Sequence, residues 1–213
     1  MSEIVVIAVD GPAASGKGTL ARRIAAELGY AYLDTGLLYR AIGLELLRDG
    51  EDPADAETAA AHAVAFDAAT TDFDDPVLRD EETTRAAGIV AANSQVREAL
   101  VEVQRRFAAA PPGGAPGAVL DGRDIGTVIC PEADHKIFVD ADIQVRADRR
   151  VKELQDRGVE SIPSRVLQDM KERDERDRTR SVAPLAPAAD ASVIDTTNLN
   201  ADAAFAEAMS IIR

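Results

Sequence analysis

The chain has 213 residues, an ordinary apolar fraction of 46% and a formal net charge of −14 at pH 7. This length fits a single domain, and the negative charge argues against nucleic acid or an anionic membrane as a general partner. Cys130 is the only cysteine, which excludes an internal disulfide and favours a reducing compartment. The apolar run Ile4–Val9 is too short for a membrane span or a signal-peptide core, so we expect a cytoplasmic chain without a membrane partner.

Strands and helices alternate in the first fifty residues. The β-branched run Ile4–Val9 predicts a strand that is buried on both faces. A helix should follow from Lys17 to about Leu28 and end at Gly29, before a short strand over Ala31–Asp34. The next helix carries the apolar positions Leu37, Leu38, Ile42, Leu46 and Leu47.

The middle of the chain is acidic, since residues 51–85 hold 11 Asp and Glu against two Arg. Helical periodicity is fair from Pro53 to Phe66, whereas residues 70–82 predict a loop or a small hairpin. A long helix should then run from about Glu81 to Phe107, with a break expected near Gly88.

The last hundred residues again alternate strand and helix. Two buried strands, "AVLDGRD" and "HKIFVDAD", follow a loop of helix breakers at 111–117. A helix should run from Ile143 to Gly158, and Pro163 should open a strongly charged one. The strand "SVIDTT" and a helix over Asp202–Ile212 close the chain. Strands that alternate with helices predict an α/β fold with a parallel sheet.

The segment "GPAASGKGT" lies between the first strand and the first helix. The pattern Gly11-x4-Gly16-Lys17 matches the phosphate-binding loop in both spacing and context. Glycines let backbone N–H groups turn toward an anion, the helix N-terminus adds donors, and Lys17 adds a point charge. The alternative is a glycine-rich turn with no ligand. The predicted phosphate cradle comprises Gly11, Pro12, Ala13, Ala14, Ser15, Gly16, Lys17, Gly18 and Thr19.

The residue after Lys17 is Gly18, and the hydroxyl comes one position later, at Thr19. This shift is typical of nucleoside monophosphate kinases rather than of GTPases or motor ATPases. Thr19 would then contact a phosphate oxygen, and a metal ion would be held more through water. Asp121, at the end of a buried strand, is the candidate for holding one of those waters.

Two further segments predict a second anion site. In "DTGLLYR" a Thr-Gly pair opens a helix at Thr35, with Arg40 further along it. In "DGRD" a strand end is followed by Arg123, which could reach a phosphate, and Asp124, which could accept from a base amino group. Alone, Arg40 could be a surface ion pair and "DGRD" a plain turn. The pattern by itself indicates a kinase with a small phosphorylated or hydroxyl acceptor.

The stretch "KERDERDRTR", residues 171–180, has no apolar residue. Arg173, Arg176 or Asp177, and Arg180 should share one helix face, where arginine forks could bind phosphate. The alternative is a solvated helix held by its own salt bridges. The preceding helix should add Arg149, Arg150 and Arg157, and the two helices would form a lid hairpin.

The chain resembles bacterial cytidylate kinase. The resemblance rests on "DGPAASGKGT", "LDTGLLYR", "DGRDIGTVICPEADHKIFVDA" and "KERDERDRTRSVAPLAPAADASVIDTT", and it is good over 3–50 and 86–213 but poor over 51–85. It implies a P-loop NTPase-type three-layer sandwich with a central five-stranded parallel sheet. It further implies one domain over 1–213, with its core at 1–50, 108–148 and 181–213, a nucleoside-monophosphate-binding region at 51–107 and a lid at about 149–180.

The resemblance implies transfer of a phosphoryl group from ATP, with Mg²⁺, to CMP or dCMP by a monomer. The acceptor phosphate would be held by Thr35, Arg40, Arg123 and Arg180. The cytosine ring would be read by Arg97 and Asp124, and the pentose contacted by Tyr39, Arg173 and Asp177. The implied catalytic residues are Lys17, Arg123, Arg173 and Arg180, and Arg149, Arg150 and Arg157 would join the ATP site.

Two departures from the family pattern concern the acceptor. Gly88 stands nine residues before Arg97, where the family usually has a serine that contacts the base, and the insertion before this helix is shortened. Two other readings stay open beside the CMP kinase. One is a kinase for UMP, AMP or a small metabolite such as shikimate, and the other is a nucleotide-binding regulatory protein with little turnover.

Overall fold

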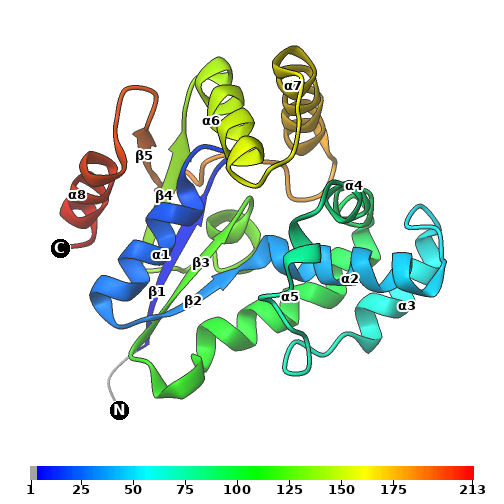
Figure 1. The fold of residues 1–213 in the computed structure, drawn as a ribbon. Helices are drawn as coiled ribbons and strands as arrows, with labels where there is room; N and C mark the ends of the chain where they lie inside the picture. The colour runs from blue at the N-terminus through cyan, green and yellow to red at the C-terminus, as the bar shows by residue number, and fades with distance from the viewer. Residues whose placement is uncertain (1–3) are drawn as a thin grey trace. The chain divides into compact units, whose positions relative to one another are not determined.

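The computed structural model describes residues 4–213, and the chain forms two compact units (Figure 1). The sheet unit comprises the chain up to Leu33 together with Pro111–Arg213, and the helical unit comprises Asp34–Ala110. The predicted core included residues 35–50. In the structure these residues belong to the helical unit. Residues 1–3 of the predicted domain lie outside the described residues.

The sheet unit is built around a five-stranded parallel sheet, as predicted, in the order β2-β3-β1-β4-β5. The strands are β1 (Val5–Asp10), β2 (Ala31–Asp34), β3 (Gly117–Gly122), β4 (His135–Asp140) and β5 (Ser192–Asp195). The central strand β1 pairs with β3 on one side and β4 on the other, and its apolar residues Ile7, Ala8 and Val9 are fully buried. Parallel pairing brings the carboxyl ends of the strands to one edge of the sheet, where ligands bind in such folds.

The helices of the sheet unit are α1 (Lys17–Leu28), α6 (Ile143–Asp156), α7 (Pro163–Thr179) and α8 (Ala201–Ile212). Helices α1 and α8 pack on each other and on the sheet, over a core that includes Ile7, Ile24 and Ile194. Helices α6 and α7 pack together, as the predicted hairpin requires. Short turns η2 (Pro112–Gly114) and η3 (Ile125–Ile129), the latter one turn of π-helix, flank β3.

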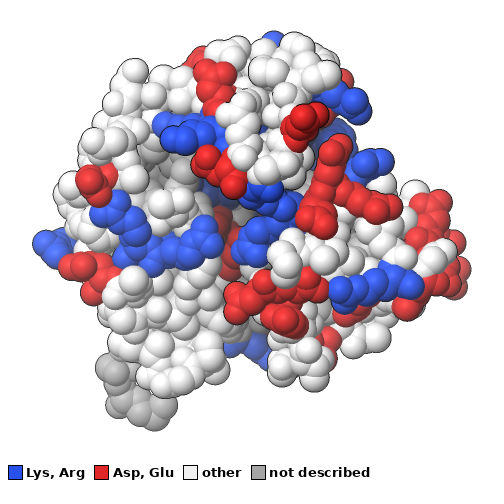
Figure 2. All heavy atoms as spheres, viewed as in Figure 1, with Lys and Arg blue, Asp and Glu red and all other residues white. Residues whose placement is uncertain are grey.

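The helical unit consists of α2 (Thr35–Asp49), α3 (Ala56–Ala65), the 3₁₀ turn η1 (Pro76–Arg79), α4 (Glu81–Val90) and α5 (Ser94–Ala109). Leu38, Ile42 and Leu100 are fully buried in its core. Acidic side chains gather over this unit on the face shown in Figure 2, in line with the acidic composition of 51–85.

Several predicted boundaries are confirmed, and one break within a helix is displaced. Helix α1 and strand β2 begin and end where the sequence predicts. The long helix is broken, as predicted, but the break comes after Gly88, which lies inside α4. The chain breaks at 91–93 instead, where the Asn93 side chain accepts from the N–H groups of Gln95 and Val96 and caps α5.

Residues 70–82 form no strand, so the hairpin alternative for them is wrong. Asp75 caps the turn η1 there by accepting from the N–H of Val77 at 2.9 Å. No helix within residues 4–213 combines the length and the apolar character that a membrane crossing needs.

Candidate functional site

The loop between β1 and α1 has a backbone that few residues can adopt. Gly11 has φ of 152°, and a Cβ there would lie 2.1 Å from the carbonyl oxygen of Val139. Gly16 and Ala14 are left-handed, with φ of 93° and 57°. A non-glycine residue held in this region stores strain of a kind that clusters at ligand-binding loops.

The Ser15 hydroxyl gives this loop a buried polar group. Ser15 is fully buried, and among the described residues its Oγ has no hydrogen-bond partner. A buried hydroxyl without a partner costs free energy, and at a helix N-terminus an anion would satisfy it together with the free backbone N–H groups. The loop is therefore suited to a phosphate.

Gly18 makes room for a carboxylate beside the loop. A Cβ at Gly18 would lie 2.8 Å from Oδ2 of Asp121, which also accepts from the Tyr32 hydroxyl at 3.2 Å. The ammonium of Lys17 lies 3.5 Å from Oδ1 of the same carboxylate. A side chain after Lys17 would require the Asp121 carboxylate to shift, and the next hydroxyl in the chain belongs to the exposed Thr19.

Arg149, one of the three arginines predicted for the ATP site on α6, contacts this loop. Its guanidinium donates to the carbonyl oxygen of Ser15 at 3.4 Å and to the carbonyl oxygen of Thr196 at 2.6 Å. The buried Thr196 hydroxyl itself donates to the Ser15 carbonyl at 2.8 Å. Arg150 instead pairs with Glu153 at 2.8 Å, and Arg157 is exposed at the end of α6.

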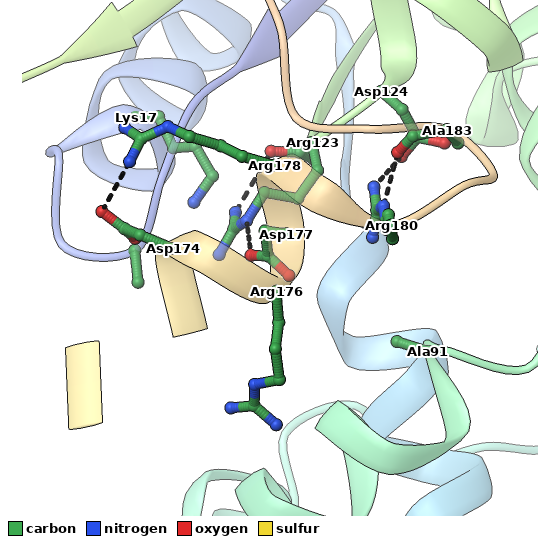
Figure 3. A network of polar contacts seen from close by, with 12 residues as sticks. Lys17, Ala91, Arg123, Asp124, Asp174, Arg176, Asp177, Arg178, Arg180 and Ala183 are labelled. Atoms are coloured by element: carbon green, nitrogen blue, oxygen red, sulfur yellow. Dashed lines mark hydrogen bonds and ion pairs between the residues drawn. The ribbon is translucent and has the colours of Figure 1, made fainter. Parts of the chain in front are cut away.

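The segment after β3 forms two ion pairs, one with α7 and one with the residue that follows it (Figure 3). Nε of Arg123 donates to Oδ2 of Asp177 at 3.1 Å, and the guanidinium of Arg180 lies 3.7 Å from Oδ1 of Asp124. Arg180 also donates through Nε to the carbonyl oxygen of Ala183. The structure thus brings together Arg123, Asp124, Asp177 and Arg180, which the sequence predicts for the acceptor site.

Asp177 is ionised in this setting. Burial by itself raises the pKa of its carboxyl, but the positive charges of Arg123, Arg173 and Arg180 and the hydrogen bond from Arg123 outweigh it, so the pKa is lowered. Two predicted phosphate-binding arginines, Arg123 and Arg180, therefore already face carboxylates in this structure.

The charged end of α7 has a buried residue after all. Asp174 is 3% exposed and forms a two-pronged pair with Arg146, which is 2% exposed, at 2.6 and 3.2 Å. Arg146 also donates to the carbonyl oxygens of Ala141 and, in the phosphate loop, Ala13. A buried ion pair thus continues the apolar stripe of α7. The alternative that this part of the helix is fully solvated is therefore wrong.

Arg146 was missed by the sequence reading, although a signal for it exists. It lies beside the apolar stripe that Ala147, Val151 and Leu154 form on α6, so its charge needed a buried partner. The shared helix face predicted for Arg180 is wrong, because α7 ends at Thr179 and Arg180 is extended, with ψ of 139°.

The helical unit holds four further predicted residues. Thr35 is 4% exposed at the start of α2, where the Asp34 carboxylate accepts from the N–H of Gly36. Arg40 donates to the carbonyl oxygen of Leu78 at 2.8 Å and to a threonine hydroxyl on α4, so it is not a solvated surface charge.

Arg97 is likewise no helix-surface charge. It is 7% exposed, its guanidinium lies 5.7 Å from the ring centre of Tyr39, and it donates to the carbonyl oxygen of Ala91. An arginine over an aromatic ring is attracted by the negative face of that ring. The base-reading and pentose-contacting residues predicted for α5 and α2 are therefore neighbours in this unit.

Asp10 was not singled out from the sequence. It ends β1, is 6% exposed, and accepts from the N–H groups of Ile125 and Gly126, each at 2.8 Å. Burial raises the pKa of its carboxyl to about 7, opposed by these two N–H groups and supported by the charges of Asp124 and Asp121.

Comparison with known proteins decides the family. The family model described as cytidylate kinase matches residues 7–213. This chain belongs to the cytidylate kinase family. Membership fits the strand, loop and helix that form the phosphate cradle and the arginines that gather after β3.

Curated relatives cover nearly the whole chain. A protein named cytidylate kinase from Paramagnetospirillum magneticum (strain ATCC 700264 / AMB-1) is 60% identical over 97% of this chain and 97% of its own. Another of that name, from Rhodospirillum rubrum, is 55% identical over 98% of this chain and 97% of its own.

Solved structures of low identity share the fold. An uncharacterized protein from Eubacterium ventriosum ATCC 27560 has a TM-score of 0.55 at 15% identity, covering 98% of each chain. A sugar kinase from Janibacter sp. HTCC2649 has a TM-score of 0.53 at 14% identity, covering 99% of this chain and 95% of its own. At this identity the likeness shows the fold alone.

Proposed function

We propose that this chain transfers the γ-phosphoryl group of ATP to CMP or dCMP, which yields ADP and CDP or dCDP. One observation carries the proposal: 60% identity with a protein named cytidylate kinase extends over 97% of both chains. Two features of the sheet unit support it, the strained phosphate loop and the separate set of arginines after β3 and α7.

ATP binds at Gly11–Thr19 in this proposal. Its phosphates satisfy the Ser15 hydroxyl and the N–H groups at the start of α1, and Lys17 contacts the outer phosphates. Arg149 supports the site by holding the Ser15 carbonyl in place, so it positions the loop as well as adding charge. Arg150 and Arg157 stay predicted ATP contacts.

The acceptor nucleotide replaces internal ion pairs in the sheet unit. Arg123 and Arg180, together with Arg173, bind its phosphate and pentose in place of the carboxylates that they face now. Asp177 is then released for the pentose hydroxyl, and Asp124 for the exocyclic amino group of cytosine. Because a phosphate takes two N–H donors from one guanidinium, it competes well with a single carboxylate contact.

The helical unit supplies the remaining predicted contacts. Thr35 and Arg40 bind the acceptor phosphate, Tyr39 contacts the pentose, and Arg97 reads the cytosine ring. The burial of Arg97 over Tyr39 supports this assignment, because a guanidinium that is already desolvated and oriented loses less entropy on binding a base.

The reaction needs little covalent help from the protein. An oxygen of the acceptor phosphate attacks the γ-phosphorus and forms a new P–O bond, while the bond to the bridging oxygen breaks and ADP leaves with its electron pair. The acceptor is already ionised near neutral pH, so no strong general base is required. Lys17, Arg123, Arg173 and Arg180 stabilise the charge on the transferring group, in a site that excludes water.

Mg²⁺ enters with ATP in this proposal. Asp121 fits the role of holding it through a water molecule, since its buried carboxylate lies beside the cradle, and the Thr19 hydroxyl is a further oxygen donor. Oxygen donors suit this ion, which keeps several of its waters. When bound, it neutralises part of the phosphate charge. Within residues 4–213 no three His, Cys, Asp or Glu residues form a metal-binding group.

The experiment is a coupled assay of ADP release with ATP-Mg and CMP, dCMP, UMP or AMP. We expect CMP and dCMP to give the highest kcat/KM. A preference for another acceptor would change the substrate assignment and leave the proposed phosphoryl transfer unchanged. ATP binding without acceptor-dependent ADP release would favour the regulatory alternative. The predicted monomer is checked by sedimentation.

A further inference from the structure

The Asp10 carboxylate joins two segments that are distant in sequence. It lies at the end of β1, directly before the phosphate loop, and its two oxygens accept from the N–H groups of Ile125 and Gly126 at 2.8 Å each. Neither the ATP contacts nor the acceptor contacts proposed above use this side chain.

The two N–H groups open the π-helical turn η3, which follows Arg123 and Asp124 directly. The first N–H groups of any helix have no partner within it. Asp124 precedes the turn but gives it no side-chain cap. The capping acceptors come instead from Asp10, more than a hundred residues away. Single π-helical turns are rare and are often found at functional sites.

The backbone around Asp10 is fixed without its side chain. Asp10 pairs with Gly122 of β3 on one side and with Phe138 of β4 on the other. Gly11 then packs against the carbonyl oxygen of Val139. The start of the phosphate loop is thus held by the sheet, so the carboxylate is left to act on the other segment, residues 123–126.

We propose that Asp10 is a positioning residue that fixes the direction of Arg123 and Asp124 toward the acceptor nucleotide. It does so by anchoring the two amides that follow them. The inference rests on the proposed function, since it assigns a role at the same acceptor site. Burial, together with the nearby charges of Asp124 and Asp121, disfavours the ionised form of this carboxyl, and this free-energy cost supports a purpose beyond folding.

The test compares Asp10→Asn with a matched control, Asp134→Asn. Asn at position 10 keeps the shape but accepts at one oxygen only and turns an amide N–H toward the second donor. Asp134 accepts from the N–H of Val6 at 2.7 Å near the opposite end of the same strand, so its replacement makes the same chemical change at a carboxylate that binds a backbone amide away from the site.

We expect Asp10→Asn to raise the KM for CMP and lower kcat by about tenfold each, because misplacement by a fraction of an ångström is costly in phosphoryl transfer. The dissociation constant for ADP should change by less than about threefold, since the sheet holds the phosphate loop. Asp134→Asn should leave all three constants within about twofold of wild type.

A second readout does not depend on activity. Amide hydrogen exchange in peptides covering 123–129 should become faster in Asp10→Asn and stay unchanged in Asp134→Asn. Wild-type KM and kcat for Asp10→Asn, or unchanged exchange, would overturn the inference. If Asp10→Asn does not fold, Asp10→Ser, which removes the opposed amide, is measured in the same way.

A wild-type enzyme that fails to phosphorylate CMP would overturn the proposed function, and hydrogen exchange would still decide whether Asp10 anchors the turn.

Discussion

Two regions of the sheet unit hold their functional side chains in different ways. At the edge of the sheet, residues 10–19 and 121–126 are fixed by backbone: a Cβ at Gly11 would lie 2.1 Å from a strand carbonyl, and the Asp10 carboxylate binds two amides. In the α6–α7 hairpin, side chains hold side chains, as Arg146 does with Asp174.

The difference suits what each region binds. Phosphates of ATP meet a loop whose shape is set before they arrive, which lowers the entropic cost of binding. The acceptor meets arginines that already face carboxylates, and ion pairs can exchange a carboxylate for a phosphate at little cost. The comparison predicts that substitutions at the sheet edge change turnover more than stability, whereas those in the hairpin's buried pair change stability first.

The largest expected effect is on the buried pair. Arg146→Met or Asp174→Leu alone leaves a buried charge without its partner and should lower the free energy of unfolding by about 3–5 kcal/mol. The double variant should regain most of this loss, since apolar residues can replace a buried ion pair. Urea unfolding of wild type, the two single variants and the double variant measures this double-mutant cycle. A loss of unfolding free energy in the double variant that equals the sum of the two single losses would contradict the account.

Lys17→Ala should come next, with a loss of about 10²–10³ in kcat, because one charge contact to the transferring phosphoryl group disappears in a dry site. Its free energy of unfolding should fall by less than in the Arg146 and Asp174 variants, since its contact with Asp121, at 3.5 Å, is longer than the 2.6 Å contact of that pair. Lys152→Ala, an exposed lysine on α6, is the matched control. Similar turnover in both variants would remove Lys17 from the mechanism.

Arg180→Ala should lower kcat by about 10-fold to 10²-fold, with a small effect on stability. Arg165→Ala, at an exposed position of α7, should keep wild-type turnover. Steady-state kinetics with CMP and ATP, alongside thermal unfolding, separates the two. The role of Arg180 would be refuted by a variant as active as the control.

The smallest expected effect concerns pH. Because the pKa of Asp177 is lowered in the folded chain, its ionised form stabilises the fold at neutral pH, and this contribution is lost as the pH falls below 3.8. The difference in free energy of unfolding between wild type and Asp177→Asn should therefore narrow on acidification. A difference that stays constant from pH 7 to about pH 3 would contradict the lowered pKa.

Local patterns predict those parts of the molecule that depend on near neighbours. The helix Lys17–Leu28 is confirmed because the glycine that ends it and the apolar spacing within it are all local. The phosphate loop and the "DGRD" turn were found for the same reason, as each is a short pattern after a strand.

Contacts between distant residues explain what the sequence missed. Asp10 contacts Ile125, Arg146 contacts Asp174 and Thr196 contacts Ser15. In each pair the partner is distant in sequence, so no local spacing identifies it. The break in the long helix was placed at Gly88 because glycine weakens helices, but the stronger signal was the capping side chain of Asn93.

The most direct test of the central claim is a crystal structure with ADP and CMP bound. The account predicts that the guanidinium groups of Arg123 and Arg180 leave Asp177 and Asp124 and contact the acceptor phosphate. Arg180 still paired with Asp124 in a fully occupied complex, with no contact to the phosphate, would contradict it.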